Sequence, residues 1–186
     1  MPDTALLLID LQQAFADRAA AGHARSVPGA EAAIAALLAQ AHARGVPVLH
    51  VHHDDPDPAS PFRADRSGGQ PLPCALPQAG EAVFVKSASS GFTGTGLAEA
   101  LHRQDITRLI VAGATIDSCV SSTVRGASDL GFAVDLVRDA VFGFGAVTPD
   151  GARHTPEVVL SVTLAALGAD FARLVTHDAV DWGGCA

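Results

Sequence analysis

Three residues with reactive side chains occupy positions that suit acyl-transfer chemistry. Asp10 and Lys86 each directly follow a short aliphatic run typical of a strand, and Cys119 comes a short turn after another. A carboxylate can take the proton of a thiol, and an ammonium can stabilise the charge that develops as the sulfur attacks a carbonyl carbon. The sequence therefore predicts a cysteine nucleophile with Asp10 as its base and Lys86 as its cation.

Lys86 is the single lysine among twelve basic residues, so this chain uses arginine wherever a general positive charge suffices. Cys119 stands at the start of a predicted helix, where the helix dipole and a nearby ammonium favour a lowered thiol pKa. Backbone N–H groups between Thr115 and Cys119 would form an oxyanion hole. Each residue alone also fits an ordinary role in packing, capping or the surface, but their joint placement at strand ends favours a catalytic triad.

Aliphatic runs alternate with helical patterns along the chain, which predicts a parallel sheet covered by helices on both faces. In such a sheet ligands bind beyond the carboxyl ends of the strands, where the three reactive residues fall. The predicted strands are Thr4–Ile9, Val46–Val51, Ala82–Val85, Arg108–Ala112, Phe132–Val137 and Phe171–Thr176.

Start and stop signals predict four helices between these strands. A segment from His52 to Gly80 has no clear period, and we expect it to cover the site, because long loops in compact domains are usually functional. The predicted helices run from Pro28 to Gly45, from Thr95 to Arg103, from Cys119 to Leu130 and from Thr155 to Gly168.

Composition narrows the class of protein. With 48% hydrophobic and 17% charged residues, the 186-residue chain is expected to form a single domain over residues 1–186. A net charge of -8 without a basic run argues against nucleic acid or an anionic membrane as partner, and no run approaches membrane-spanning length. The cysteines Cys74, Cys119 and Cys185 are few and far apart, which suits reduced thiols in the cytoplasm.

Three stretches of the chain resemble the motifs of the isochorismatase-like cysteine hydrolases, a superfamily that includes nicotinamidases, carbamoylsarcosine amidohydrolases and isochorismatases. The stretches are LIDLQQAF at 8–15, KSASSGFTGTGL at 86–97 and GATIDSCVSST at 113–123. In the third, Ile116 replaces the threonine of the family motif. The match spans nearly the whole chain and implies a three-layer α/β/α, Rossmann-like fold with six parallel strands.

The resemblance also implies roles for individual residues. Asp10 would be the general base, Lys86 would stabilise charge, and Cys119 would form a thioester that water hydrolyses. The amides of Thr115 and Cys119 would hold the oxyanion, with a cis peptide between Ala114 and Thr115. Four further residues are candidates for the substrate pocket, with core packing as the alternative for the aromatic ones: Phe15, His53, Phe92 and Ile116.

Within the superfamily, Cys119 favours the branch that cleaves amide, ureido or carbamoyl substrates, because isochorismatases proper lack this cysteine. A zinc-dependent nicotinamidase and a vinyl-ether hydrolase stay open as alternatives, as does a catalytically silent binding domain. His52, His53 and Asp54 are metal-type residues without the nicotinamidase spacing, so we expect no metal and no cofactor. Members of the family commonly form oligomers, which implies a homo-oligomer here.

Overall fold

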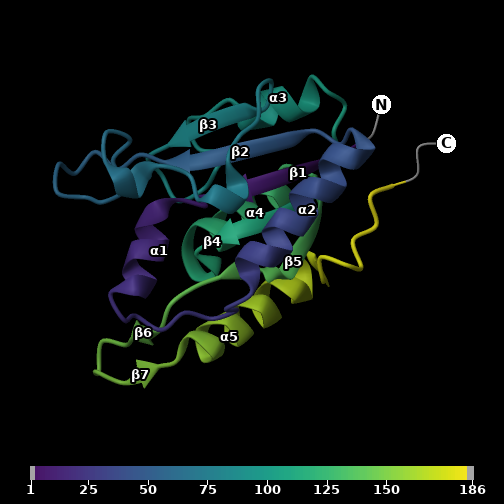
Figure 1. Cartoon of the computed structure of the whole chain (residues 1–186). Helices are drawn as coiled ribbons and strands as arrows, with labels where there is room; N and C mark the ends of the chain where they lie inside the picture. Colours follow the sequence, from purple (N-terminus) through teal and green to yellow (C-terminus); the bar gives the residue numbers. More distant parts are fainter. Residues whose placement is uncertain (1–2, 184–186) are drawn as a thin grey trace.

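A computed structural model describes residues 3–183 of the chain. Its centre is a sheet of six parallel strands in the order β3–β2–β1–β4–β5–β8 (Figure 1). The predicted α/β class with six parallel strands is confirmed. The strands are β1 Thr4–Ile9, β2 Val48–His53, β3 Ala82–Lys86, β4 Arg108–Ala114, β5 Ala133–Phe142 and β8 Arg173–Val175.

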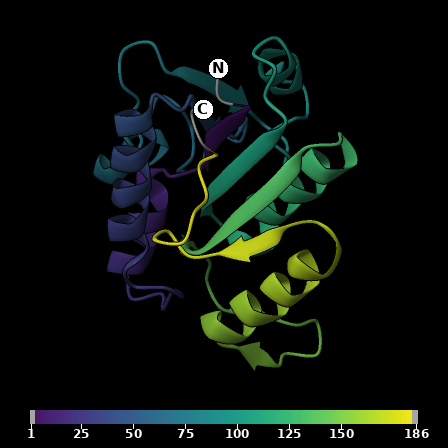
Figure 2. The same ribbon diagram turned by 90° about the vertical axis from the view of Figure 1, so that its right-hand side faces the viewer.

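Helices pack on both faces of this sheet, as the alternation of side chains along β1 shows. Leu6 and Leu8 belong to the core under α1 and α2, whereas Leu7 and Ile9 belong to the core under α3, α4 and α5. Figure 2 shows the blue α2 on one side of the sheet and the green α4 and α5 on the other. The helices are α1 Gln13–Ala20, α2 Ala30–Arg44, α3 Leu97–His102, α4 Ser121–Asp129 and α5 Pro156–Asp170.

Several helix ends follow the signals in the sequence. Gly45 ends α2 in the left-handed conformation, and the Thr155 hydroxyl accepts the N–H of Val158 at the start of α5. The last helix continues past its predicted stop to Asp170. At Gly168, inside this helix, a side chain would lie 2.9 Å from Leu174 of β8. The absence of a side chain lets the helix pack closely on the strand.

Several parts of the fold differ from the prediction. The helix α1 was not predicted, because the residue before it, Gln12, is not a typical N-cap residue. The Gln12 side chain instead binds the backbone of His53. The strand β5 runs on to Phe142 through Arg138 and Asp139, after a shift of register against β4. The remaining strands, β6 Ala146–Val147 and β7 Arg153–His154, form a small separate hairpin.

The strand order reverses at β1. From β1 the chain moves outward to β2 and β3, and it then returns to β4 on the other side of β1. Such a reversal opens a crevice at the carboxyl ends of the strands. Asp10 follows β1, His53 and Lys86 end β2 and β3, and Cys119 follows β4. No helix within residues 3–183 is long and apolar enough to cross a membrane.

Candidate active site

Asp10 and Lys86 form a buried ion pair at the carboxyl edge of the sheet. Asp10 is fully buried, with a positive φ of 49° that an aspartate rarely adopts, and Lys86 is 2% exposed. The Lys86 Nζ atom donates to Asp10 Oδ2 at 2.7 Å. Since β2 lies between β1 and β3, this pair spans the end of a whole strand.

The Lys86 ammonium has three acceptors within reach, one for each of its protons. Besides Asp10, it contacts Cys119 Sγ at 3.3 Å and His53 Nδ1 at 3.4 Å. Because the ammonium can only donate, Nδ1 of His53 is the nitrogen without a proton. Burial lowers the pKa of His53, and the charge of Lys86 lowers it further. The imidazole is therefore neutral, with its proton on Nε2.

The second carboxylate oxygen of Asp10 is left without a hydrogen bond. Oδ1 is buried and has no partner within residues 3–183. Burial raises the pKa of Asp10 and outweighs the opposing pull of Lys86. Asp10 therefore has one oxygen fixed by the ammonium and another that is available to take up a proton.

Cys119 lies half-buried in a π-helical turn, Ile116–Val120, that follows β4. Burial raises the pKa of its thiol to about 11; Asp10 also raises it, while Lys86 lowers it. The lowered thiol pKa expected from the sequence is therefore wrong for the free protein. The thiol keeps its proton at neutral pH and lies beside a carboxylate whose own pKa is raised by burial.

The backbone before Cys119 is held tightly. Gly113 has φ 143°, and a side chain on it would lie 2.2 Å from the Ile9 carbonyl oxygen, so only glycine lets β4 pass β1 here. The peptide bond between Ala114 and Thr115 is cis. The Thr115 carbonyl oxygen accepts the N–H groups of Ser118 and Val120, each at 3.1 Å. Within residues 3–183, the Thr115 N–H itself donates no backbone hydrogen bond.

Two polar side chains that were not predicted to have a role fix the site's framework. Gln12 holds His53 from both sides: its Oε1 accepts the His53 N–H at 2.8 Å, and its Nε2 donates to the His53 carbonyl at 2.9 Å. The same Nε2 donates to the carbonyl of Gly69, in the segment from His52 to Gly80 that was expected to cover the site, here called the cover segment. Thr123 donates to the Cys119 carbonyl and accepts the N–H of Gly91. The only sequence signal for either residue was its place in a motif.

Comparison with known proteins agrees with this geometry. The Isochorismatase domain model matches residues 4–157. The chain belongs to the isochorismatase family. It is similar to the family protein YrdC of Bacillus subtilis, with 31% identity over 94% of this chain and 92% of that protein. It is also similar to maleamate amidohydrolase of Pseudomonas putida, with 32% identity over 74% of this chain and 71% of that protein.

A crystal structure of an isochorismatase-family protein from Chromobacterium violaceum has the same fold. Its TM-score is 0.89 and its identity 38%, over 95% of this chain and 91% of that one. The resemblance inferred from the three motifs is therefore confirmed. The protein is a hydrolase of the isochorismatase family.

The predicted substrate contacts lie in different parts of this isochorismatase-family domain. His53 joins the triad through Lys86. Phe15 packs in an aromatic cluster that includes Phe62. The centroid of the Phe62 ring lies 4.8 Å from that of Phe15 and 6.0 Å from that of His53. Phe92 instead stacks on Phe132 beside α4, and Ile116 is fully buried in that same core. Substrate contacts by these residues stay predictions.

His52 and His53 end β2 and Asp54 follows it, and these metal-type residues point in different directions, as expected for neighbours on a strand. The centroid of the His52 ring lies 6.1 Å from that of His50. Burial lowers the pKa of His52 to about 4, and the charge of His50 lowers it further. Asp54 accepts the N–H of Ala64 and so anchors the cover segment. Within residues 3–183, no group of three or more His, Cys, Asp or Glu is arranged to hold a metal ion.

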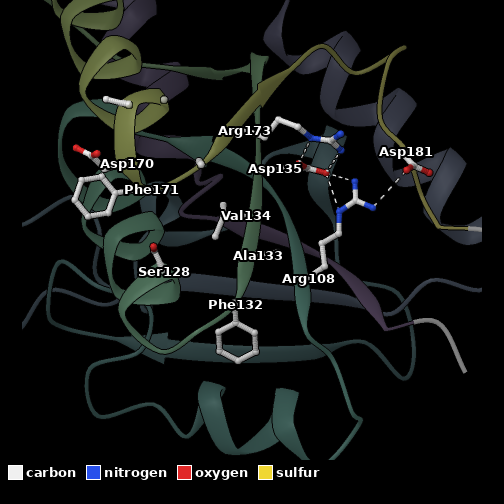
Figure 3. A pocket seen from close by; sticks show the side chains of 13 residues that line it. Arg108, Ser128, Phe132, Ala133, Val134, Asp135, Asp170, Phe171, Arg173 and Asp181 are labelled. Carbon is white, nitrogen blue, oxygen red and sulfur yellow. Dashed lines mark hydrogen bonds and ion pairs between the residues drawn. The ribbon is translucent and has the colours of Figure 1, made fainter.

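A cavity of about 620 Å³ lies near the amino ends of β4, β5 and β8 (Figure 3). Its charged centre is Asp135, which accepts hydrogen bonds from Arg108 and Arg173 on both of its oxygens. In contrast to Asp10, this carboxylate has no free oxygen to accept a proton. The cavity is far from the strand ends that carry the triad, and we assign it no part in catalysis.

Proposed function

We propose that this isochorismatase-family hydrolase cleaves the C–N bond of a small amide, ureido or carbamoyl substrate through a Cys119 thioester. One observation carries the proposal. The Lys86 ammonium contacts both the Asp10 carboxylate and the Cys119 sulfur, while the second oxygen of Asp10 is buried and unpartnered. This is the arrangement that a base, a nucleophile and a stabilising charge require.

In the first half of the reaction, the Cys119 sulfur attacks the substrate carbonyl carbon and its proton moves to Asp10. The raised pKa of Asp10 makes it a stronger base than an exposed aspartate, which offsets the raised pKa of the thiol. Lys86 stabilises the charge on the sulfur during attack. The C–N bond then breaks, the Asp10 proton passes to the leaving nitrogen, and a thioester stays on Cys119.

In the second half, Asp10 takes a proton from water as the water oxygen attacks the thioester carbon. The C–S bond breaks, and the proton returns to the sulfur, so the free enzyme is restored and an acid is released. The amides of Thr115 and Cys119 are the proposed oxyanion donors. The Thr115 N–H supports this role because it donates no backbone hydrogen bond within the described residues.

The family assignment supports the class of substrate. One of the similar proteins is named maleamate amidohydrolase, which favours amide cleavage over vinyl-ether cleavage for this chain. The nicotinamidase alternative makes a different prediction, because zinc would be needed for turnover. We expect activity to survive removal of divalent metal by a chelator; stoichiometric zinc that restores a chelated, inactive enzyme would favour the nicotinamidase alternative instead.

The test is an ammonia-release screen over small amides and ureido acids, followed by intact-mass analysis during turnover. We expect an acyl adduct on Cys119 with the best substrate. The Cys119→Ala variant should fold normally and lose turnover, because alanine removes only the nucleophile. Full activity in pure Cys119→Ala would reject the covalent mechanism, and no turnover of any C–N substrate would favour the silent binding domain.

The remaining expectations belong to the same proposal. A small molecule is the expected partner, the family resemblance implies a homo-oligomer, and the few, widely spaced cysteines favour the cytoplasm. The mass of the protein in solution, measured by light scattering, would test self-assembly independently of the chemistry.

A further inference from the structure

A basic hollow of about 440 Å³ lies between the end of α1 and the β6–β7 hairpin. Its ionisable lining residues are Arg18, His23, Arg153 and His154, and no Asp or Glu lines it. This composition is unusual for a chain with a net charge of -8. The hollow is distinct from the triad and none of the steps above uses it.

The two arginines of this hollow lack the partners that most arginines of the chain have. Four other arginines pair with carboxylates and three donate to backbone carbonyls. Neither Arg18 nor Arg153 makes such a contact within residues 3–183. An unpaired guanidinium keeps five N–H donors that suit carboxylate or phosphate oxygens. The hollow therefore concentrates unused donors for an anion.

Arg18 is also held in place. Its guanidinium carbon lies 4.1 Å from the centroid of the Phe144 ring, and that ring stacks on Phe15 at 6.2 Å. Stacking occupies the face of a guanidinium and leaves its edge, which carries the N–H donors, free for a ligand. A pre-ordered arginine loses less conformational entropy on binding than a mobile one.

The backbone adds to the positive field. Pro156, which lines the hollow, is the first residue of the 15-residue helix α5, so the positive end of the helix dipole lies at the hollow's wall. Gly145 lets the hairpin close against the start of this helix, because a side chain there would lie 2.7 Å from the His154 carbonyl oxygen. Two guanidinium groups and a helix end thus meet around one hollow.

We propose that this hollow is a second binding site, for a small molecule with two or more negative charges on carboxylate or phosphate groups. Arg18 and Arg153 are the principal donors. The site borders the aromatic cluster of Phe15, Phe142 and Phe144 and does not include the triad. It stands independently of the proposed hydrolase activity.

Isothermal titration calorimetry at constant ionic strength tests the site, with inorganic pyrophosphate and citrate as separate probes. We expect one saturable site per chain for at least one probe. Arg18→Gln and Arg153→Gln should each weaken binding by about tenfold, because each removes a charge-assisted, bidentate contact. Arg138→Gln is the matched control: it removes an exposed arginine on β5 that does not line the hollow and, within residues 3–183, pairs with no carboxylate.

The probe that binds identifies the ligand chemistry, phosphate for pyrophosphate and carboxylate for citrate. Thermal melting of each variant checks that these exposed substitutions keep the fold. Absence of saturable binding by both probes would overturn the proposal. So would an equal loss in Arg138→Gln, which would indicate a general charge effect, or undiminished binding in the Arg18→Gln/Arg153→Gln double variant.

Discussion

Asp10 and Asp135 are both buried carboxylates beside cations, yet they lie at opposite ends of the same sheet and are held in opposite ways. Asp10 has one oxygen bound by Lys86 and the other free within the described residues. Asp135 receives N–H groups from Arg108 and Arg173 on both oxygens, as Figure 3 shows. The two carboxylates differ in the number of their donors, and Asp10 also lies deeper in the protein.

Their pKa values shift in opposite directions for this reason. Burial raises the pKa of Asp10, and the single ammonium of Lys86 does not compensate. Burial also acts to raise the pKa of Asp135, but hydrogen bonds from Arg173 and Arg108 outweigh it and hold the pKa below its ordinary value. A fully donor-bound carboxylate is locked in its charged form, whereas a half-bound one is left able to act as a base.

The largest expected effect is on turnover. Asp10→Asn should lower the rate by about 10²–10⁴-fold, because it removes the group that accepts the Cys119 proton. Asp135→Asn makes the same chemical change at the other end of the sheet and should leave the rate within a few-fold of the parent. Both rates are measured on the best substrate from the ammonia screen. Comparable losses in the two variants would refute the functional distinction between the carboxylates.

The next largest effect on turnover is expected from Lys86→Arg. This variant tests why Asp10 faces an ammonium while Asp135 faces guanidinium groups. Lys86→Arg should lower turnover by about a hundredfold while the protein still folds, because a misplacement of about 1 Å has such a cost. A guanidinium is planar and tends to bind a carboxylate in a bidentate fork, as Arg173 does at Asp135. It would occupy the free oxygen of Asp10.

The control for this variant is its melting temperature, since a normal melt excludes unfolding as the cause of lost activity. Turnover within a few-fold of the parent would show that any positive charge suffices at position 86, and the catalytic assignment of this lysine would be withdrawn.

The comparison also bears on what sequence alone can predict. The proximity of Asp10, Lys86 and Cys119, the proposed triad, could be predicted because they fall at strand ends, and the strands are visible as local aliphatic runs. The hydrogen bonds that give each group its properties join residues far apart in the chain, as Gln12 joins His53. The raised pKa of Cys119 depends on burial, which arises only when the turn packs into the fold.

The direction of a side chain is equally hidden from a motif. Phe92 lies close to Lys86 in the sequence, yet it packs on Phe132 beside α4. The continuation of β5 was missed because Arg138 and Asp139 interrupt its apolar pattern, although the strand continues through them to Phe142. Local patterns thus identify strands and reactive residues, whereas tertiary contacts decide how those residues behave.

A third prediction concerns stability, which both carboxylates are expected to affect. Asp135→Asn should lower the free energy of unfolding by about 2–3 kcal/mol, because two arginines lose their charged partner. We place the loss below the range for fully buried pairs, since the Arg173 side chain is 57% exposed. Asp10→Asn should cost a comparable amount, because it leaves the buried Lys86 ammonium without its charged partner. Urea unfolding at neutral pH measures both.

The dependence on pH gives the matched control. The folded pKa of Asp135 is lowered, so its stabilisation is present above the ordinary aspartate pKa of about 4 and is lost as pH falls through the folded pKa. Asp10 has the opposite sign, because its raised pKa makes ionisation costly to the folded state. Asp135→Asn should therefore flatten the acid side of the stability curve. An unchanged acid side would contradict the assignment.

The smallest expected effect is on the reactivity of Cys119 in the free protein. Its pKa of about 11 predicts slow alkylation by iodoacetamide at about pH 8, because only the thiolate reacts. Asp10 is one cause of that raised pKa, so Asp10→Asn should speed labelling by a few-fold, although burial, the larger cause, remains. Asp135→Asn should not change the rate.

Mass spectrometry of the Cys119 peptide measures the labelling rate, and the peptide of Cys74, whose pKa is raised chiefly by burial, serves as the internal control. Fast labelling of Cys119 in the parent protein would contradict its raised pKa. Equal rates in parent and Asp10→Asn would show that the carboxylate does not act on the thiol. The base assigned to Asp10 would then have to be sought elsewhere.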